Sequence, residues 1–323
     1  YGAISEIMPG PAADTVAGGQ VVLNAESAAM RGAQVGDVLD LIGADGGIRS
    51  FTIGHLATPA EIGGTEIVMS SEQGDQMGAT RITRIVVYGV FSRPSLDAEL
   101  AARNLIDGGA VRIVRSWDPQ RPDDTLGLLR TKQLLGEFDY RILSNGLSVD
   151  PEWTSANLVR VNYSGVAVRA NCHRAIVDSL QAALNEVAEA GLAWAIDVGN
   201  TNTYGGCYNP RFNRILGTEL GNVSRHTWGQ AIDMNTVTNA QGRVPQMDCR
   251  VVRIFREHGF AWGGNFLLPD GMHFEYVGEP RHEYQFPSEY CPNLPNGELG
   301  LSATTPSQRD VLFADDGWSG HGP

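Results

Sequence analysis

The chain carries the stretch SRHTWGQAID at residues 224–233 and, further along, the stretch DGMHFEY at residues 270–276. A catalytic zinc ion is typically held by three protein ligands drawn from His, Asp and Glu, with a fourth position open to water. Three side chains in these stretches supply such a set: His226, Asp233 and His273. Asp270 is left over as a carboxylate. The two stretches therefore predict a Zn²⁺ site with a spare carboxylate beside it.

The spacing in the first stretch predicts a bend in the chain. The seven-residue gap between His226 and Asp233 would suit one face of a helix. Gly229 and the β-favouring Ile232 disfavour a helix there. In a straight strand, an odd gap would point the two side chains to opposite faces. We therefore expect the chain to bend at Gly229, since glycine tolerates unusual backbone angles.

The second stretch alternates as a strand does. Over residues 272–276, His273 and Glu275 share one face, and two aromatic residues share the other. This arrangement lets His273 reach the metal, while Glu275 hydrogen-bonds that imidazole without binding the metal itself.

The pattern S-x-H-x-x-G-x-A-x-D, followed by D-x-x-H, resembles the zinc peptidases that cut bacterial cell-wall peptides. These include D-alanyl-D-alanine carboxypeptidases and L-alanyl-D-glutamate endopeptidases of the phage endolysin type, in a fold shared with lysostaphin and hedgehog domains. Four more segments are similar to this family: residues 136–140, 150–153, 204–211 and 259–264. The resemblance covers about residues 128–295, and it implies an α+β domain with a small antiparallel sheet and flanking helices.

The resemblance also implies an activity. It predicts a zinc metallopeptidase that hydrolyses amide bonds in peptidoglycan peptides, with a zinc-bound water as the nucleophile and Asp270 as the general base. Arg211 matches the family's arginine after the Tyr204 loop, so we expect it to stabilise the oxyanion. Ser224 is expected to be a hydrogen-bond partner of substrate or of a ligand. Tyr204 and Trp262 are expected to bind substrate, although buried packing is an equal alternative for Trp262.

The sequence leaves two choices about function open. The aspartate in D-x-x-H favours an endopeptidase slightly over a carboxypeptidase, since some carboxypeptidase relatives use glutamate in this role. The alternative to an enzyme is a non-catalytic, zinc-containing, peptide-binding ectodomain of an envelope complex. Asp270 disfavours that alternative, because a structural site has no use for a free carboxylate three residues before a ligand.

The remaining histidines have simpler interpretations. His258 falls in the last turn of a predicted helix over residues 250–258, where the helix dipole favours it. His173 opens a predicted amphipathic helix. Three histidines have no partner at metal-binding spacing: His55, His282 and His321.

Four cysteines lie in the proposed catalytic half, none of them in a C-x-x-C pair: Cys172, Cys207, Cys249 and Cys291. Their even number predicts two disulfides with three pairings open, and four free thiols are the alternative. Disulfides would place the protein outside the cytoplasm, where its expected substrate lies. The chain shows no run of eighteen apolar residues and begins at Tyr1, so a targeting or membrane segment ahead of it would fit export.

The net charge of −13 disfavours partners such as nucleic acid or anionic membranes. Cell-wall peptides often carry free carboxylates. An acidic protein that binds them would therefore need a local basic pocket.

The first hundred residues predict a different module. Short β-rich runs separated by glycine turns occupy residues 20–23, 37–42, 48–53, 66–69 and 84–88. We expect a β-rich α+β module over residues 1–117, including a helix at 95–105 and a strand near 110–115, which weakly resembles extracytoplasmic domains of FtsX- and MacB-type permeases. It would be a binding or regulatory module, with a membrane-anchored or envelope protein as its expected partner. The expected order then runs through a linker, a zinc peptidase domain and a tail: residues 118–127, 128–297 and 298–323.

Overall fold

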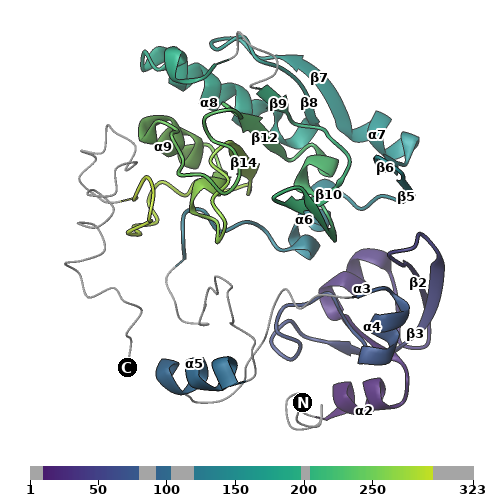
Figure 1. Ribbon diagram of the computed structural model, residues 1–323. Helices are drawn as coiled ribbons and strands as arrows, with labels where there is room; N and C mark the ends of the chain where they lie inside the picture. The colour runs from purple at the N-terminus through teal and green to yellow at the C-terminus, as the bar shows by residue number, and fades with distance from the viewer. Residues whose placement is uncertain (1–9, 80–91, 103–119, 198–203, 294–323) are drawn as a thin grey trace. The chain divides into compact units, whose positions relative to one another are not determined.

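The computed structural model describes residues 10–79, 92–102, 120–197 and 204–293 (Figure 1). The chain divides into two compact units, one of Tyr1–Phe91 with Gly127–Glu137 and one of Ser92–Leu126 with Phe138–Pro323. Helices and several small, mostly antiparallel sheets confirm the predicted α+β class. Within the described ranges, no helix is both long enough and apolar enough to cross a membrane. The predicted strands at 84–88 and 110–115, the tail and His321 lie outside these ranges.

The first unit is built on one four-stranded sheet in the order β2-β3-β1-β4. Its strands are β1 (Val21–Asn24), β2 (Val38–Ile42), β3 (Ile48–Ala57) and β4 (Ile67–Val68). Its helices are α2 (Pro11–Ala17), α3 (Ala25–Arg31), α4 (Ser71–Gln76) and α6 (Leu128–Leu135). β1 runs parallel to β3, and its apolar residues are fully buried because separate hydrophobic clusters cover its two faces.

The boundary between the units differs from the expected one. Helix α6 groups with the first unit, where Nζ of Lys132 lies 3.0 Å from a carboxylate oxygen of Glu66. The expected peptidase domain began at residue 128. Residues 120–126, expected as linker, group with the second unit instead.

The second unit has a central antiparallel sheet in the order β13-β14-β12-β9. Its strands are β9 (Tyr204–Gly206), β12 (Ala231–Met234), β13 (Phe260–Trp262) and β14 (His273–Tyr276). Three hairpins accompany it: β5 (Tyr140–Leu143) with β6 (Gly146–Val149), β7 (Leu158–Asn162) with β8 (Arg169–His173), and β10 (Phe212–Ile215) with β11 (Thr218–Val223). The helices are α5 (Arg93–Ala102), α7 (Pro151–Asn157), α8 (Val177–Glu189) and α9 (Cys249–Glu257).

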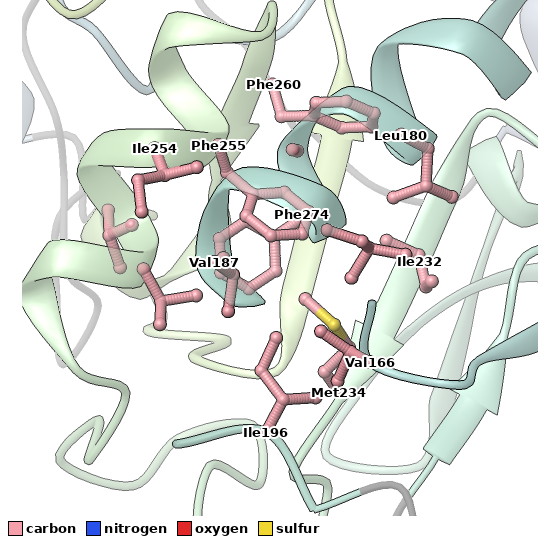
Figure 2. Packing of buried hydrophobic residues seen from close by; sticks show 14 of the residues in the cluster. Val166, Leu180, Val187, Ile196, Ile232, Met234, Ile254, Phe255, Phe260 and Phe274 are labelled. Carbon is pink, nitrogen blue, oxygen red and sulfur yellow. The ribbon is translucent and has the colours of Figure 1, made fainter. Parts of the chain in front are cut away.

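One face of this sheet forms the hydrophobic core with α8 and α9 (Figure 2). The predicted apolar stripe of the first of these helices is buried: Ile176, Leu180, Leu184 and Val187. Ile232 of β12 is the register partner of Phe274 of β14, and both point into this core. Because strand side chains alternate, Asp233 and His273 must point to the opposite face.

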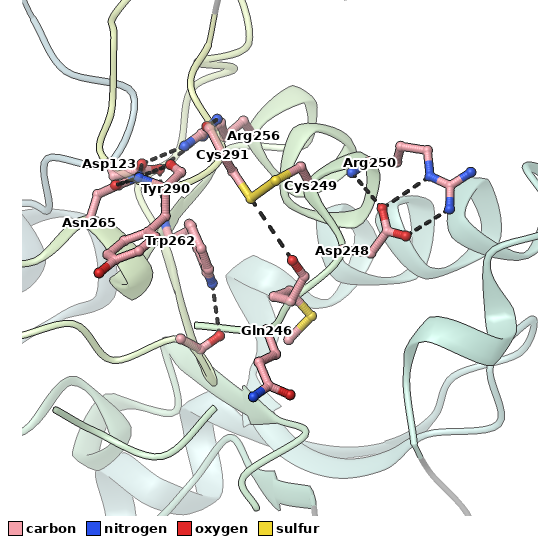
Figure 3. The surroundings of a disulfide bond; sticks show 12 residues. Asp123, Gln246, Asp248, Cys249, Arg250, Arg256, Trp262, Asn265, Tyr290 and Cys291 are labelled. Carbon is pink, nitrogen blue, oxygen red and sulfur yellow. Dashed lines mark hydrogen bonds and ion pairs between the residues drawn. A yellow bond between two sulfur atoms is a disulfide. The ribbon is translucent and has the colours of Figure 1, made fainter. Parts of the chain in front are cut away.

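Two disulfides close the second unit, and they exclude the alternative of four free thiols. Cys172 of β8 is bonded to Cys207. Cys249 of α9 is bonded to Cys291, as Figure 3 shows. The sequence left three pairings open, and the pairing found links residues that are 35 and 42 positions apart.

Asp123 anchors the segment before α6 to the second unit (Figure 3). Its carboxylate accepts hydrogen bonds from the Arg256 guanidinium at 2.9 and 2.5 Å, from the Trp262 backbone at 3.1 Å and from the Asn265 amide at 2.7 Å. Arg256 is 1% exposed, so this ion pair is buried. The segment is therefore part of the folded unit.

Candidate metal centre

Three side chains converge on the face of the sheet opposite the core. Oδ1 of Asp233 lies 3.1 Å from Nε2 of His226 and 3.1 Å from Nδ1 of His273, and the two nitrogens are 3.2 Å apart. A tetrahedral zinc ion with bonds of about 2.0–2.1 Å would place its ligands about 3.3 Å from one another. The three predicted ligands thus lie at separations that suit one small metal ion.

A short turn brings His226 to this point. His226 lies in the 3-10 helix η3 (Arg225–Trp228), and Gly229 follows with a φ of 66°. The left-handed glycine produces the bend that the sequence predicts. A Cβ at this position would lie 2.9 Å from the backbone nitrogen of His173, so the close approach of β8 also requires glycine.

Strand pairing positions the other two ligands. Asp233 of β12 and His273 of β14 are register partners, so their side chains leave the sheet side by side. Glu275 follows His273 on the same face, as predicted, and its Oε2 lies 3.4 Å from Nε2 of His273. Arg225 forms an ion pair with Glu275 at 3.2 Å, which holds this buried carboxylate in place.

Hydrogen bonds define which nitrogen each imidazole offers. Nδ1 of His226 lies 2.9 Å from the carbonyl oxygen of Cys207, and because a carbonyl only accepts, this nitrogen carries the proton. Nε2 of His273 likewise faces the Glu275 carboxylate. When each imidazole is neutral, its second ring nitrogen therefore turns a lone pair toward Asp233. Three acceptors that face one point fit a bound cation. Metal-binding histidines usually donate their other ring N–H to a backbone carbonyl or a carboxylate, and Cys207 and Glu275 supply these two groups here.

The charges of this cluster match that interpretation. Burial alone would lower the pKa of His273, but its hydrogen bonds to Asp233 and Glu275 raise that pKa to about 10. Burial alone would raise the pKa of Asp233, but the two imidazoles hold it well below its usual range. Without a metal, the cluster therefore retains a proton where a cation would otherwise bind.

Asp270 lies beside the cluster but outside the ligand set. Its Oδ2 accepts a 3.3 Å hydrogen bond from the Gln241 amide, and its Oδ1 is buried without a hydrogen-bond partner among the described residues. Burial raises the pKa of this carboxyl, while the charges of His273 and His226 oppose that rise. A buried oxygen with no partner and a raised pKa are properties of a proton acceptor held ready for a ligand.

Arg211 lies near the same group of charges. Burial lowers the pKa of its guanidinium, and the carboxylates of Asp233 and Asp270 act against that shift. Nη1 of Arg211 donates a 2.6 Å hydrogen bond to Oγ of Ser224. A cation thus lies within electrostatic reach of the ligand Asp233 and of Asp270.

The structure changes the interpretation of two predicted substrate contacts. Ser224 is 1% exposed, and its Oγ accepts hydrogen bonds from Arg211 and from the backbone of His226, so it caps η3. Trp262 is fully buried and donates to the Gly271 carbonyl at 2.8 Å, which is the packing alternative. Tyr204 lies in β9 as a partner of Met234, and its side chain is outside the described set.

The other histidines have the simpler environments expected for them. His173 caps the 3-10 helix η1 (Arg174–Ile176), with its Nδ1 accepting from the Ala175 backbone at 3.1 Å. His258 ends α9 and lies 2.7 Å from Glu186. Among the residues that the structure describes, the only group that could hold a metal ion is the predicted triad.

Sequence reasoning missed three supporting groups. Arg225 directly precedes His226 in the stretch 224–233, so the sequence could have indicated that it lies near the site. Gln241 and the carbonyl of Cys207 carried no signal, because an isolated glutamine is ordinary and a carbonyl belongs to every residue.

One segment of this unit matches a known protein family. Residues 218–276 match the family model of D-alanyl-D-alanine carboxypeptidase. This carboxypeptidase-like segment includes η3, β12 and β14, and with them the three converging ligands and Asp270. The match supports a peptidase related to peptidoglycan. No curated protein and no solved structure matches the chain.

Proposed function

We propose that the second unit is a zinc-dependent peptidase that hydrolyses amide bonds in peptidoglycan peptides. One observation carries the proposal: the lone pairs of two oriented imidazoles and a carboxylate converge, with a buried and only partly bonded carboxylate beside them. The similarity of residues 218–276 to D-alanyl-D-alanine carboxypeptidase supports the substrate class.

Zinc suits these donors, because it accepts imidazole nitrogen and carboxylate oxygen in four-coordinate sites. The residues that would hold it are His226, Asp233 and His273. When bound, zinc supplies Lewis acidity that polarises the scissile carbonyl and acidifies water near neutral pH. Cys207 and Glu275 keep the two imidazoles in the tautomers that this requires.

The neighbouring charged groups would handle the proton and the developing negative charge. Asp270 takes the proton from the attacking water and returns it to the leaving amine. Its buried, partner-free Oδ1 and its raised pKa support this role. Arg211 offers a cation for the negative charge that develops on the carbonyl oxygen, and Ser224 fixes that guanidinium.

Two further parts of the proposal concern the setting of the enzyme. We place the protein outside the cytoplasm, because its two disulfides suit an oxidising compartment and its proposed substrate lies in the cell wall. We also propose that the β-rich first unit binds an envelope partner or regulates access.

A peptide-binding module with a structural zinc is the competing function. Structural zinc sites are usually closed by four protein ligands, whereas the converging set here has three. Asp270 strengthens the enzymatic proposal, since an unbonded buried carboxylate oxygen is costly unless it has a task.

The decisive experiment is mass spectrometry of purified peptidoglycan fragments after incubation with the protein, with chelator and with chelator plus added Zn²⁺. Loss of a terminal D-alanine that zinc restores would establish a carboxypeptidase. Zinc-restored cleavage inside the stem or cross-bridge would establish an endopeptidase. No metal-dependent product from any fragment would reject the enzymatic proposal in favour of the binding module.

A further inference from the structure

A hollow of about 260 Å³ opens where the β7–β8 hairpin meets β9. Figure 1 shows these strands next to one another, and the backbone nitrogen of Tyr208 donates to the carbonyl of Asn171 at 2.9 Å. Arg160 and Arg169 line the hollow from the hairpin, and Gly206 lines it from β9. Arginine, asparagine and tyrosine residues line it, so the hollow suits a small polar group better than an apolar side chain.

Side-chain alternation on the hairpin separates its core-facing residues from Arg169 and Asn171. On the hairpin, Ala170 and Cys172 point into the hydrophobic core that also contains Ile232 and Phe274. Their strand neighbours Arg169 and Asn171 therefore point away from that core.

Gly206 connects the hollow to the metal centre directly. It is the register partner of Asp233, and it also lines the hollow. An added Cβ at Gly206 would meet no atom within 4 Å, so the space above it is open. The carbonyl of the next residue, Cys207, holds the metal ligand His226. Strand β9 therefore borders both the hollow and the metal centre.

Within the described ranges, the two arginines of the hollow have no acidic partner. Arg160 and Arg169 are exposed, and neither forms an ion pair or side-chain hydrogen bond within the part of the chain that the structure describes. Other arginines of this unit face carboxylates: Arg214, Arg225 and Arg256. In a chain of net charge −13, two unpaired guanidinium groups in one hollow form a local site for an anion.

We propose that this hollow binds a free carboxylate of the peptide whose amide lies at the metal centre. Guanidinium groups match the planar carboxylate with paired hydrogen bonds. Asn171 and Tyr208 also line the hollow and carry further N–H and O–H donors. The inference rests on the proposed function for the identity of the peptide, and it makes the arginines substrate-positioning residues.

Binding measured without turnover tests the proposal. The probe is L-alanyl-γ-D-glutamyl-L-lysyl-D-alanyl-D-alanine, compared with two versions in which either the glutamate α-carboxylate or the terminal carboxylate is a carboxamide. Affinities are measured by calorimetry on the full chain with the metal chelated. The variants are Arg160→Gln with Arg169→Gln and, as a matched control, Arg141→Gln on the exposed β5–β6 hairpin.

We expect the wild-type protein to bind the free acid about tenfold or more tightly than one of the two carboxamides. The amide that loses affinity identifies the carboxylate bound. The double variant should bind all three peptides alike, while Arg141→Gln should keep the preference. Equal wild-type affinities, absent binding, or a preference that survives in the double variant would overturn the proposal.

The same experiment separates this inference from the proposed function. Charge-dependent binding without zinc-dependent hydrolysis would leave the hollow as the anion site of a binding module and reject the peptidase. Hydrolysis without charge-dependent binding would reject the hollow alone. Added salt should weaken the wild-type preference, since the arginines are exposed to solvent.

Discussion

Nδ1 of His226 donates to the carbonyl oxygen of Cys207 at 2.9 Å, and Cys207 is bonded through its sulfur to Cys172 of β8. The disulfide therefore fixes the segment whose carbonyl orients His226, a candidate metal ligand. It links a covalent constraint in the core to the tautomer of an imidazole on the opposite face of the sheet.

Replacing this disulfide should weaken metal binding as well as stability. For Cys172→Ala with Cys207→Ala we expect a stability loss of about 2–4 kcal/mol and a zinc affinity about tenfold lower, because the partner of His226 becomes less fixed. The matched control is Cys249→Ala with Cys291→Ala, which opens a loop of similar length but touches no ligand. Equal zinc affinities in the two double variants would contradict the link.

Substitutions of the proposed ligands and of the proposed base should have different effects on metal content. His226→Ala and His273→Ala should each lose metal and turnover together, because each removes one of three ligands. Asp270→Ala should keep stoichiometric zinc and lose about 10²–10⁴-fold in kcat. Metal content by atomic emission and turnover on the same samples provide the check. Full activity of Asp270→Ala, or full metal content of either histidine variant, would refute these roles.

Gln241 should set the acid side of the pH profile. Burial raises the pKa of Asp270, and the hydrogen bond from Gln241 lowers it again. Gln241→Leu removes that donor, so the pKa of Asp270 should rise further. A general base works only when ionised, so the acid limb of kcat/KM should move to higher pH. Gln181→Leu, at a glutamine of α8 bonded to Asn185, is the control. An unmoved acid limb in Gln241→Leu would remove Gln241 from this role.

Zinc binding should release a proton. In the metal-free protein the pKa of His273 is raised to about 10, so at pH 7 to 9 this imidazole is protonated and zinc must displace its proton. Because His273 must lose one proton, the zinc association constant should rise about tenfold per pH unit in this range. Calorimetry in buffers of different ionisation enthalpy counts the protons released. His258→Ala, which lies outside the site, should leave that count unchanged. Zinc binding without proton release would contradict the expectation.

The metal cluster was predictable because its residues sit in two short stretches whose local geometry follows from side-chain alternation and one glycine. The bend at Gly229 and the shared face of His273 and Glu275 needed only rules of backbone geometry. The stripe on α8 followed from helical spacing in the same way.

Long-range pairings were not predictable in this way. The partner of Cys172 is 35 residues away, and no local rule selects Cys207 over the other two cysteines. Burial of Ser224 was not predicted, and the two alternatives for Trp262 could not be separated, because the family pattern identifies residues near a site but not which side chains are buried. The resemblance of the first module to permease domains stays a prediction.

The anchoring of Asp123 also decides where the second unit can be cut. A recombinant fragment that begins at residue 128 would lack this carboxylate and leave the Arg256 guanidinium buried without its counter-charge. Breaking such a pair costs about 3–5 kcal/mol, a large part of the 5–15 kcal/mol or so that keeps a typical domain folded. Because Arg121 also lies over the ring of Phe286, the shortest fragment worth expressing starts before residue 121. A fragment cut at residue 128 should therefore unfold at a lower temperature than one that keeps Asp123.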